Sequence, residues 1–287
     1  MRFLLPVLRL LRVGTLFSPA ADVTASLCVL GLAWHGDAVA AVVAGVLLYA
    51  GGMVWNDVAD RRVDAAQRPE RPLPRGDLSL TFAVLLGVTL FAVALWLSPC
   101  RAYHAGIAAL VLLYDFTSKR LAWLGPVLMG SLRALNLGTA LALPAAADAA
   151  PTAAGSLWLA SACYGLYILA VTVVGIFEDE PRVRGRAVAA VQSVPPLVAW
   201  FGIAAVQRSF WPAPAVALLP ALFFLRRNAR TRDWDQRAIR GSMMLLLLGT
   251  MLYTALLALA AGRPWEAAAI AAAIAPARWI ARRIALT

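Results

Sequence analysis

Residues 56–76 read Asn-Asp-Val-Ala-Asp-Arg-Arg-Val-Asp-Ala-Ala-Gln-Arg-Pro-Glu-Arg-Pro-Leu-Pro-Arg-Gly. This stretch places three aspartates and five arginines directly after a long apolar run. Dense charge of both signs at the end of a hydrophobic helix is a candidate site for a metal ion and a phosphate at a membrane surface.

The rest of the chain explains why a membrane is expected. Hydrophobic residues make up 62% of it and charged residues 14%, and the mean hydropathy is +0.75. These values lie well outside those of soluble proteins, so we expect an all-α, polytopic membrane protein. A helix needs about 20 apolar residues to cross a bilayer. Nine apolar runs are candidate spans: 13–34, 37–56, 78–99, 102–118, 121–143, 156–177, 187–206, 211–225 and 241–261.

We expect residues 1–287 to form a single transmembrane domain, with two segments outside the nine spans. Residues 1–12 place arginines among leucines, which is typical of an amphipathic helix on the membrane surface. The Ala-rich piece 265–281 contains Pro276 and is open to three interpretations: a short crossing, a re-entrant segment or an interfacial helix.

The basic residues predict the orientation. Arginine and lysine in short loops stay on the cytoplasmic side, and placing the amino terminus inside puts nearly all of them there. Residues 57–77 and 178–186 then become cytoplasmic loops of an inner-membrane protein. The net charge of +11 is explained by this topology and by anionic membrane lipids, so no nucleic-acid partner is expected.

The carboxylates of the opening stretch share one face if the second span continues through them. At 100° per residue, Asn56, Asp57, Asp60 and Asp64 fall within an arc of about 100°. Clustered carboxylates repel one another unless a cation sits among them, and Mg²⁺ prefers such oxygen ligands. The alternative is a solvated helix end neutralised by Arg61 and Arg62.

The segment that follows favours the metal site. The three prolines at 69, 72 and 74 stiffen the backbone. They hold Arg68, Arg71 and Arg75 at defined spacing. The pattern N-D-x-x-D-x-x-x-D followed by R-P-x-R-P-L-P-x-G resembles the first signature of the UbiA superfamily of intramembrane prenyltransferases.

That resemblance implies a nine-helix bundle with a central cavity open to lipid, where Mg²⁺ bridges aspartates to the diphosphate of a polyprenyl donor. By matching positions, Asn56, Asp57, Asp60 and Asp64 would bind the metal, with Asp60 and Asp64 also catalytic. Arg68 would bind the diphosphate or order the loop.

A second resemblance lies at the end of the fourth span. Tyr114-Asp-Phe-Thr-Ser-Lys119-Arg120 is similar to the aromatic-then-Lys-Arg ending of the family. Tyr114, Lys119 and Arg120 are therefore candidate substrate-binding residues, since Arg and Lys both bind diphosphate oxygens. The alternative is a basic anchor at a helix end.

The second aspartate motif of the family is altered here. It would follow the sixth span as D-x-x-x-D, but Glu178-Asp179-Glu180-Pro181 has no acidic residue four positions after Glu178 or Asp179. We expect Glu178 or Asp179 to keep a catalytic role as ligand or general base, with neighbouring arginines replacing a second metal. The alternative is a protein that binds the lipid diphosphate without transferring it.

Two charges fall inside apolar runs, where an ionised group is costly unless paired or facing a wet cavity. These are Asp22 and Arg133, and Asn136 shares a helical face with Arg133. Arg133 and Asn136 are candidate ligands of the acceptor or of the donor diphosphate, with Asp22 as counter-ion. An Arg-Asp pair that fixes the bundle is the other interpretation.

The resemblance as a whole implies Mg²⁺-dependent transfer of a polyprenyl group to a small aromatic or cyclic acceptor. The run from Tyr114 to Asn136 also resembles the UbiA-like member of the bacterial ebo clusters, which is linked to an isoprenoid or cyclitol precursor. A non-catalytic binder or transporter of a prenylated or phosphorylated lipid is the alternative function.

Overall fold

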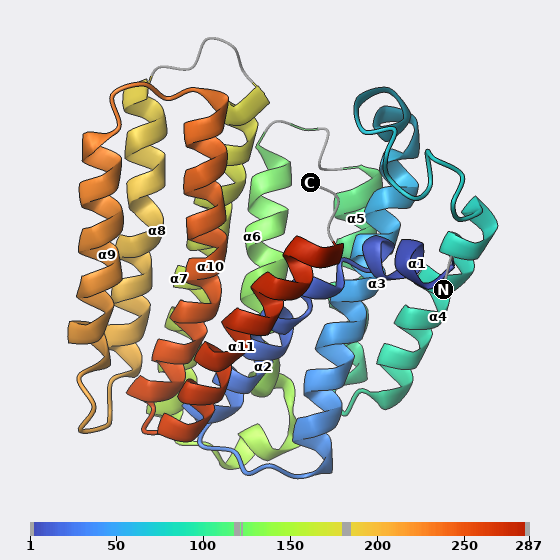
Figure 1. Ribbon diagram of the computed structural model, residues 1–287. Helices are drawn as coiled ribbons and strands as arrows, with labels where there is room; N and C mark the ends of the chain where they lie inside the picture. The colour runs from blue at the N-terminus through green and yellow to red at the C-terminus, as the bar shows by residue number, and fades with distance from the viewer. Residues whose placement is uncertain (1–2, 118–120, 122, 180–184, 285–287) are drawn as a thin grey trace.

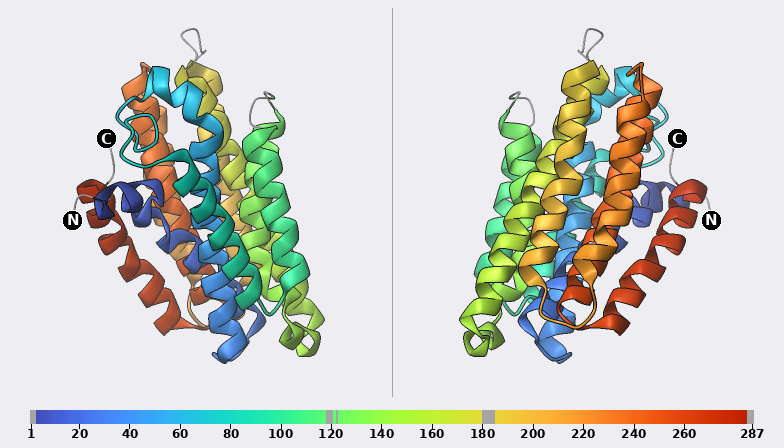
Figure 2. Two further views of the ribbon diagram at one scale, coloured as in Figure 1. Left: turned by 90° about the vertical axis from the view of Figure 1, so that its right-hand side faces the viewer. Right: turned by 90° about the vertical axis from the view of Figure 1, so that its left-hand side faces the viewer.

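The computed structural model describes residues 3–117, 121, 123–179 and 185–284, and all regular structure in these ranges is helical. The chain forms a bundle whose long helices run roughly side by side (Figures 1 and 2). The α-helices are α1 (Leu4–Leu10), α2 (Phe17–Leu30), α3 (Gly36–Gln67), α4 (Leu80–Leu97), α5 (Arg101–Phe116), α6 (Leu124–Leu137), α7 (Pro151–Asp179), α8 (Gly185–Val206), α9 (Ala213–Arg230), α10 (Gln236–Ala260) and α11 (Pro264–Ile284). Short 3₁₀ turns are η1 (Val13–Thr15), η3 (Gly138–Ala142) and η4 (Pro144–Asp148).

Each of the nine expected spans coincides with one helix, from α2 to α10. Within the described residues, six helical segments are long and apolar enough to cross a membrane, and they contain α2, α3, α4, α7, α8 and α10. The other three, α5, α6 and α9, are shorter or carry more charge, so the count of nine crossings stays a prediction. The piece expected at 265–281 is one continuous helix, α11, despite Pro276.

Small residues and local caps determine how the helices pack. A Cβ on Gly130 of α6 would lie 2.5 Å from the carbonyl oxygen of Gly165 in α7, so these two backbones approach closely only because both residues are glycine. At the end of α2, Gly31 adopts φ 71° and ends the helix in the left-handed conformation. The side chain of Asp235 accepts a hydrogen bond from the backbone N–H of Ala238 and begins α10.

The two ends of the chain meet on one face of the bundle. Helix α11 runs diagonally across α2 and α10, and its last turn reaches α1 (Figure 1). A Cβ on Gly14 would lie 2.8 Å from the backbone nitrogen of Ala281, and Arg9 Nε donates to the carbonyl oxygen of Ile284 at 3.1 Å. Helix α1 exposes Leu4 and Leu5 and buries Leu10, and its place on the membrane surface stays a prediction.

We call the end of the bundle where α3 and α7 finish the motif end. Helix α3 continues to Gln67, so the first half of the expected 57–77 loop is helical. Helix α7 extends to Asp179 and α8 begins at Gly185, so the expected 178–186 loop is shorter than the sequence suggested. The active-site segments therefore stand largely on helices, which hold side chains more rigidly than loops do.

Candidate active site

The last two turns of α3 bring two carboxylates together. Asp57 and Asp64 lie two turns apart on one face and are only 4% and 2% exposed. Arg71, from the Pro-rich segment, donates from one nitrogen to both: its Nη1 lies 3.3 Å from Asp57 Oδ1 and 2.6 Å from Asp64 Oδ2. Two carboxylates thus converge on a single positively charged atom, the kind of arrangement expected of a cation site.

The Pro-rich segment is positioned by its own packing. Leu73 and Leu78 lie against Leu10 of α1, Val54 of α3 and Ala83 of α4 in a small hydrophobic cluster. The backbone N–H of Arg75 donates to the carbonyl of Arg71, which closes a turn. These contacts hold Arg71 over the end of α3. Arg68 lies at the edge, 54% exposed, with Nη1 3.9 Å from Asp64 Oδ1.

An arginine from the amino-terminal segment completes the group. Arg12 Nη2 donates to Asp57 Oδ1 at 2.9 Å. Among the described residues other than glycine, Arg12 alone has a positive φ, at 48°. Its carbonyl accepts from the Thr15 backbone N–H at 2.7 Å and from Thr15 Oγ1 at 2.9 Å, which supports that backbone conformation. A non-glycine residue in this region is strained, and strain of this kind gathers at functional sites.

The other two expected metal ligands have different surroundings. Asn56 Nδ2 donates to Asp115 Oδ1, 3.2 Å away on α5, and Asp60 is half-buried. Tyr114, next to Asp115, is half-buried and close enough to Asp60 and Arg12 to interact with them electrostatically. Within the described ranges no three acidic, histidine or cysteine side chains form a group that would hold a metal ion. Lys119 and Arg120 lie outside these ranges.

At the end of α7, Glu178 forms an ion pair with Arg240 of α10. The next residue, Asp179, is the last of the helix, and its side chain lies outside the described part of the structure. Arg227 of α9 donates to Ser242 Oγ of α10 at 2.8 Å. The altered second motif therefore contains an acidic helix end paired with a basic residue of α10, and an arginine of α9 contacts the same helix.

A second polar group lies inside the bundle between α2, α6 and α7. Arg133 Nη2 is 3.1 Å from Asp22 Oδ2 and donates to Tyr164 Oη at 2.6 Å and to Ser18 Oγ at 2.5 Å. Tyr164 Oη in turn donates to Asp22 Oδ1 at 3.0 Å. Asn136 Nδ2 donates to Asp22 Oδ2 at 2.9 Å. We call Asp22, Arg133, Asn136 and Tyr164 the buried polar cluster.

The buried polar cluster brings together the three residues that the sequence singled out for their charge or polarity within apolar runs. Asp22 is 1% exposed, and Arg133 and Asn136 are each 8% exposed. The guanidinium of Arg133 also lies over the ring of Tyr49, 5.6 Å from its centroid. The Arg-Asp pair of the structural interpretation is therefore present, whereas binding of a substrate by Arg133 and Asn136 stays a prediction.

The UbiA prenyltransferase family profile matches residues 23–228, which is more than half of the chain. The chain belongs to the UbiA prenyltransferase family. The match includes α3 with its carboxylates, the Pro-rich segment and the end of α7.

Curated relatives of this UbiA protein include archaeal digeranylgeranylglyceryl phosphate synthases. The protein from Methanopyrus kandleri is 32% identical over 165 residues, which is 56% of this chain and 57% of that relative. The protein from Thermococcus gammatolerans is 28% identical over 234 residues, covering 71% of this chain and 80% of the relative. The chain thus matches little more than half the length of the Methanopyrus protein.

Solved structures share the fold of this UbiA protein. A digeranylgeranylglyceryl phosphate synthase structure superposes with a TM-score of 0.63 at 18% identity, covering 96% of this chain and all of the other. A UbiA homologue from Archaeoglobus fulgidus, described as bound to DMAPP and Mg²⁺, gives a TM-score of 0.62 at 14% identity, with 93% and 99% coverage. At these identities the likeness establishes the fold alone.

Proposed function

We propose that this protein transfers a polyprenyl group from its diphosphate to an acceptor at the motif end, in a reaction that depends on Mg²⁺. The observation that carries the proposal is the convergence of Asp57 and Asp64 on Arg71 Nη1. Two buried carboxylates that share one guanidinium nitrogen supply the oxygen ligands that a cation site would need. Membership of the UbiA family and the Mg²⁺ and DMAPP named for the Archaeoglobus homologue support the same conclusion.

The donor set suits Mg²⁺. This ion usually takes one or two carboxylates, several waters and phosphate oxygens, and a pair such as Asp57 and Asp64 meets that need without a third close acid. Asn56, Asp57, Asp60 and Asp64 would hold it. When bound, Mg²⁺ would neutralise the negative charge that develops on the departing diphosphate.

The arginines of the site would act on the same charge. Arg71 and Arg12 neutralise Asp57 and Asp64 in the structure, and a cation between the carboxylates would release both guanidinium groups toward phosphate oxygens. Arginine binds phosphate through two parallel N–H donors. We propose that Arg68, Lys119 and Arg120 also bind phosphate oxygens of the donor. Tyr114 would lie beside the reacting carbon of the prenyl group. Asp60 and Asp64 would set the position of the diphosphate.

For the acceptor we propose a phosphorylated glycerol lipid in place of the small aromatic or cyclic acceptor that the family resemblance implied. The relatives are named as synthases of digeranylgeranylglyceryl phosphate. In this chain the Glu178 carboxylate lies against Arg240, and Arg227 lies nearby on the neighbouring helix end. Basic side chains there would neutralise an acceptor phosphate, while Glu178 or Asp179 removes the proton from the attacking hydroxyl.

Release of diphosphate tests the proposal. Purified protein with geranylgeranyl diphosphate, Mg²⁺ and geranylgeranylglyceryl phosphate is expected to release diphosphate, and Asp60→Ala is expected to abolish this release. An aromatic acceptor such as 4-hydroxybenzoate should give at least tenfold less product. Tight Mg²⁺-dependent binding of the diphosphate without turnover on either acceptor would instead favour the non-catalytic binder or transporter.

A substitution of Arg12 would separate its role from that of the metal ligands. Arg12→Gln is expected to weaken binding of the prenyl diphosphate about tenfold or more, because a hydrogen bond to a charged group is worth about 1.5–3 kcal/mol. The apparent Mg²⁺ affinity should not fall, since the variant removes a positive charge that competes for Asp57. Titrations of donor and of Mg²⁺ by isothermal calorimetry measure both. Arg101→Gln is the matched control, because exposed Arg101 likewise donates to a backbone carbonyl, that of Trp96, but does not touch the segment that carries Arg12.

A further inference from the structure

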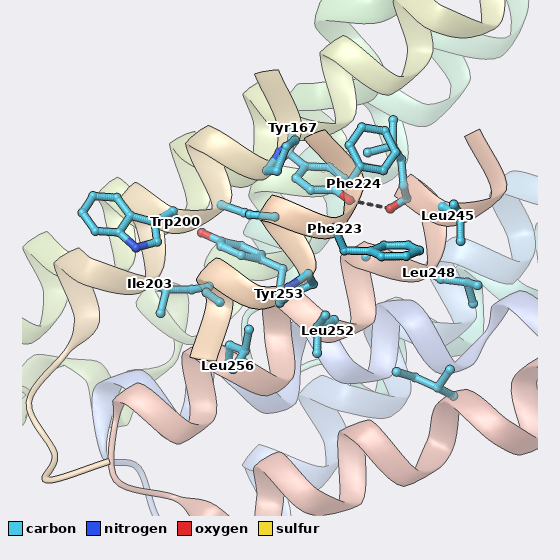
Figure 3. A pocket seen from close by; sticks show the side chains of 18 of the residues that line it. Tyr167, Trp200, Ile203, Phe223, Phe224, Leu245, Leu248, Leu252, Tyr253 and Leu256 are labelled. Carbon is cyan, nitrogen blue, oxygen red and sulfur yellow. Dashed lines mark hydrogen bonds between the residues drawn. The ribbon is translucent and has the colours of Figure 1, made fainter. Parts of the chain in front are cut away.

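A second candidate site lies away from the carboxylates, in a pocket of about 290 Å³ between α7, α8, α9, α10 and α11. Its volume is at the lower end of the range of about 300–1,000 Å³ that is typical of ligand sites. Aromatic side chains form much of its wall, as Figure 3 shows. They are Tyr167, Trp200, Phe223, Phe224 and Tyr253.

The wall presents ring faces because the tyrosine hydroxyls are occupied elsewhere. Tyr167 Oη donates to the carbonyl of Leu246 at 2.5 Å, and Tyr253 Oη donates to that of Ala160 at 2.8 Å. Tyr253 also stacks on Tyr164, with ring centroids 5.4 Å apart. Tyr164 belongs to the buried polar cluster, so this stack separates the pocket from that cluster. The pocket is therefore suited to a hydrocarbon chain.

One charged side chain lines this pocket, Arg278 of α11. It is exposed and makes no ion pair with any residue that the structure describes. Arg282, four residues further along α11, is exposed as well. Two arginines at this spacing face the same side of a helix and repel each other unless an anion lies between them.

The residues around these arginines are of the kind found at a membrane interface. Trp279, between them on α11, is 63% exposed, and tryptophan gathers where a bilayer meets water. The last residue of α11, Ile284, contacts Arg9 of α1, and α1 is the expected surface helix. An anionic head group at this level would lie directly beside the mouth of the apolar pocket.

In a bilayer an apolar pocket by itself selects little, because lipid chains are as apolar as the side chains they would meet. Selectivity must come from charge. We propose that this pocket binds one chain of an anionic phospholipid, whose phosphate is held by Arg278 and Arg282. Nothing in this inference depends on prenyl transfer, so the two proposals fail separately.

Phospholipid retention tests the inference. The full chain is stripped of lipid in detergent, and its affinity for phosphatidylglycerol and for phosphatidylcholine with the same acyl chains is measured by native mass spectrometry. The intact protein should bind phosphatidylglycerol about tenfold or more tightly than phosphatidylcholine. Arg278→Gln should remove this preference, and Ala221→Trp, which fills the pocket, should weaken binding of both lipids.

Arg283→Gln is the matched control, because Arg283 stacks over Trp279 at 5.8 Å and does not line the pocket. The Arg283→Gln variant should keep the preference for phosphatidylglycerol over phosphatidylcholine. Equal loss in Arg278→Gln and Arg283→Gln would indicate a general basic surface and overturn the inference, as would an unchanged preference in Arg278→Gln. Displacement of phosphatidylglycerol by geranylgeranyl diphosphate but not by inorganic phosphate would assign the pocket to the substrate and would also overturn it.

Discussion

Asp64→Asn is expected to slow diphosphate release from a polyprenyl diphosphate by about 100-fold or more at saturating Mg²⁺. Asparagine keeps the shape of the side chain and removes its charge. Asp64 is 2% exposed and lies 2.6 Å from Arg71 Nη1, so its charge acts in a setting where water screens it little. Losing one preorganised electrostatic partner in such a site typically lowers the rate by about 10²–10³. A coupled pyrophosphatase assay measures the release.

Asp77→Asn is the control for this prediction. Asp77 lies in the same segment and pairs with Arg75 at 3.5 Å, but both side chains are substantially more exposed. A pair of this kind contributes little, so the rate should stay within about twofold of the intact protein. Asp64→Asn with nearly full activity would mean that the α3 carboxylates only fix the Pro-rich segment.

Asp22→Ala is expected to destabilise the protein by about 3–5 kcal/mol, the effect of breaking a buried ion pair from one side. Arg133 would remain inside the bundle without the carboxylate that accepts its hydrogen bonds. The midpoint of unfolding in a denaturing detergent titration measures the loss. Asp148→Ala, an acidic residue of the connection between α6 and α7, should leave the midpoint unchanged.

The double variant Asp22→Leu with Arg133→Met distinguishes a structural role of the ion pair from a role in substrate binding. Replacing both partners of a buried pair by apolar groups of similar size is often neutral or stabilising, so the midpoint should recover. A stable double variant that still transfers the prenyl group would show that the buried polar cluster is structural. A stable double variant without activity would support binding of a substrate by Arg133 and Asn136.

The sequence predicted what depends on local pattern. Each of the nine apolar runs coincides with a helix, although the bundle has further helices and nine crossings stay a prediction, and helical periodicity placed Asp57 and Asp64 on one face of α3. The charge argument also identified Asp22 and Arg133 correctly as exceptional positions, because an ionised group inside a membrane needs a partner. The UbiA family resemblance that rested on 21 residues is confirmed by the match over 23–228.

What the sequence could not predict depends on contacts between distant segments. Arg12 appeared to be one of several surface arginines, and only the fold shows that it reaches Asp57, 45 residues away. The hydroxyl of Tyr164 had no signal in the sequence beyond an aromatic side chain in a span, although it lies between Arg133 and Asp22. The expected central cavity also depends on side-chain packing. The pocket of about 290 Å³ is lined by the five helices α7 to α11 and not by α3. A chamber under the α3 carboxylates therefore stays a prediction.

The contact between α1 and α11 sets an order for assembly. Arg12 precedes Asp57 in the chain, yet the segment that carries it is held by Ala281 and Ile284 of α11; Arg9 and Ile284 stand 275 residues apart. During synthesis the carboxylates of α3 enter the membrane long before α11 is made. The full set of charges around Asp57 can therefore gather only after α11 has been made, so we expect a chain shortened before Ala281 to lose prenyl transfer even if its other helices have inserted.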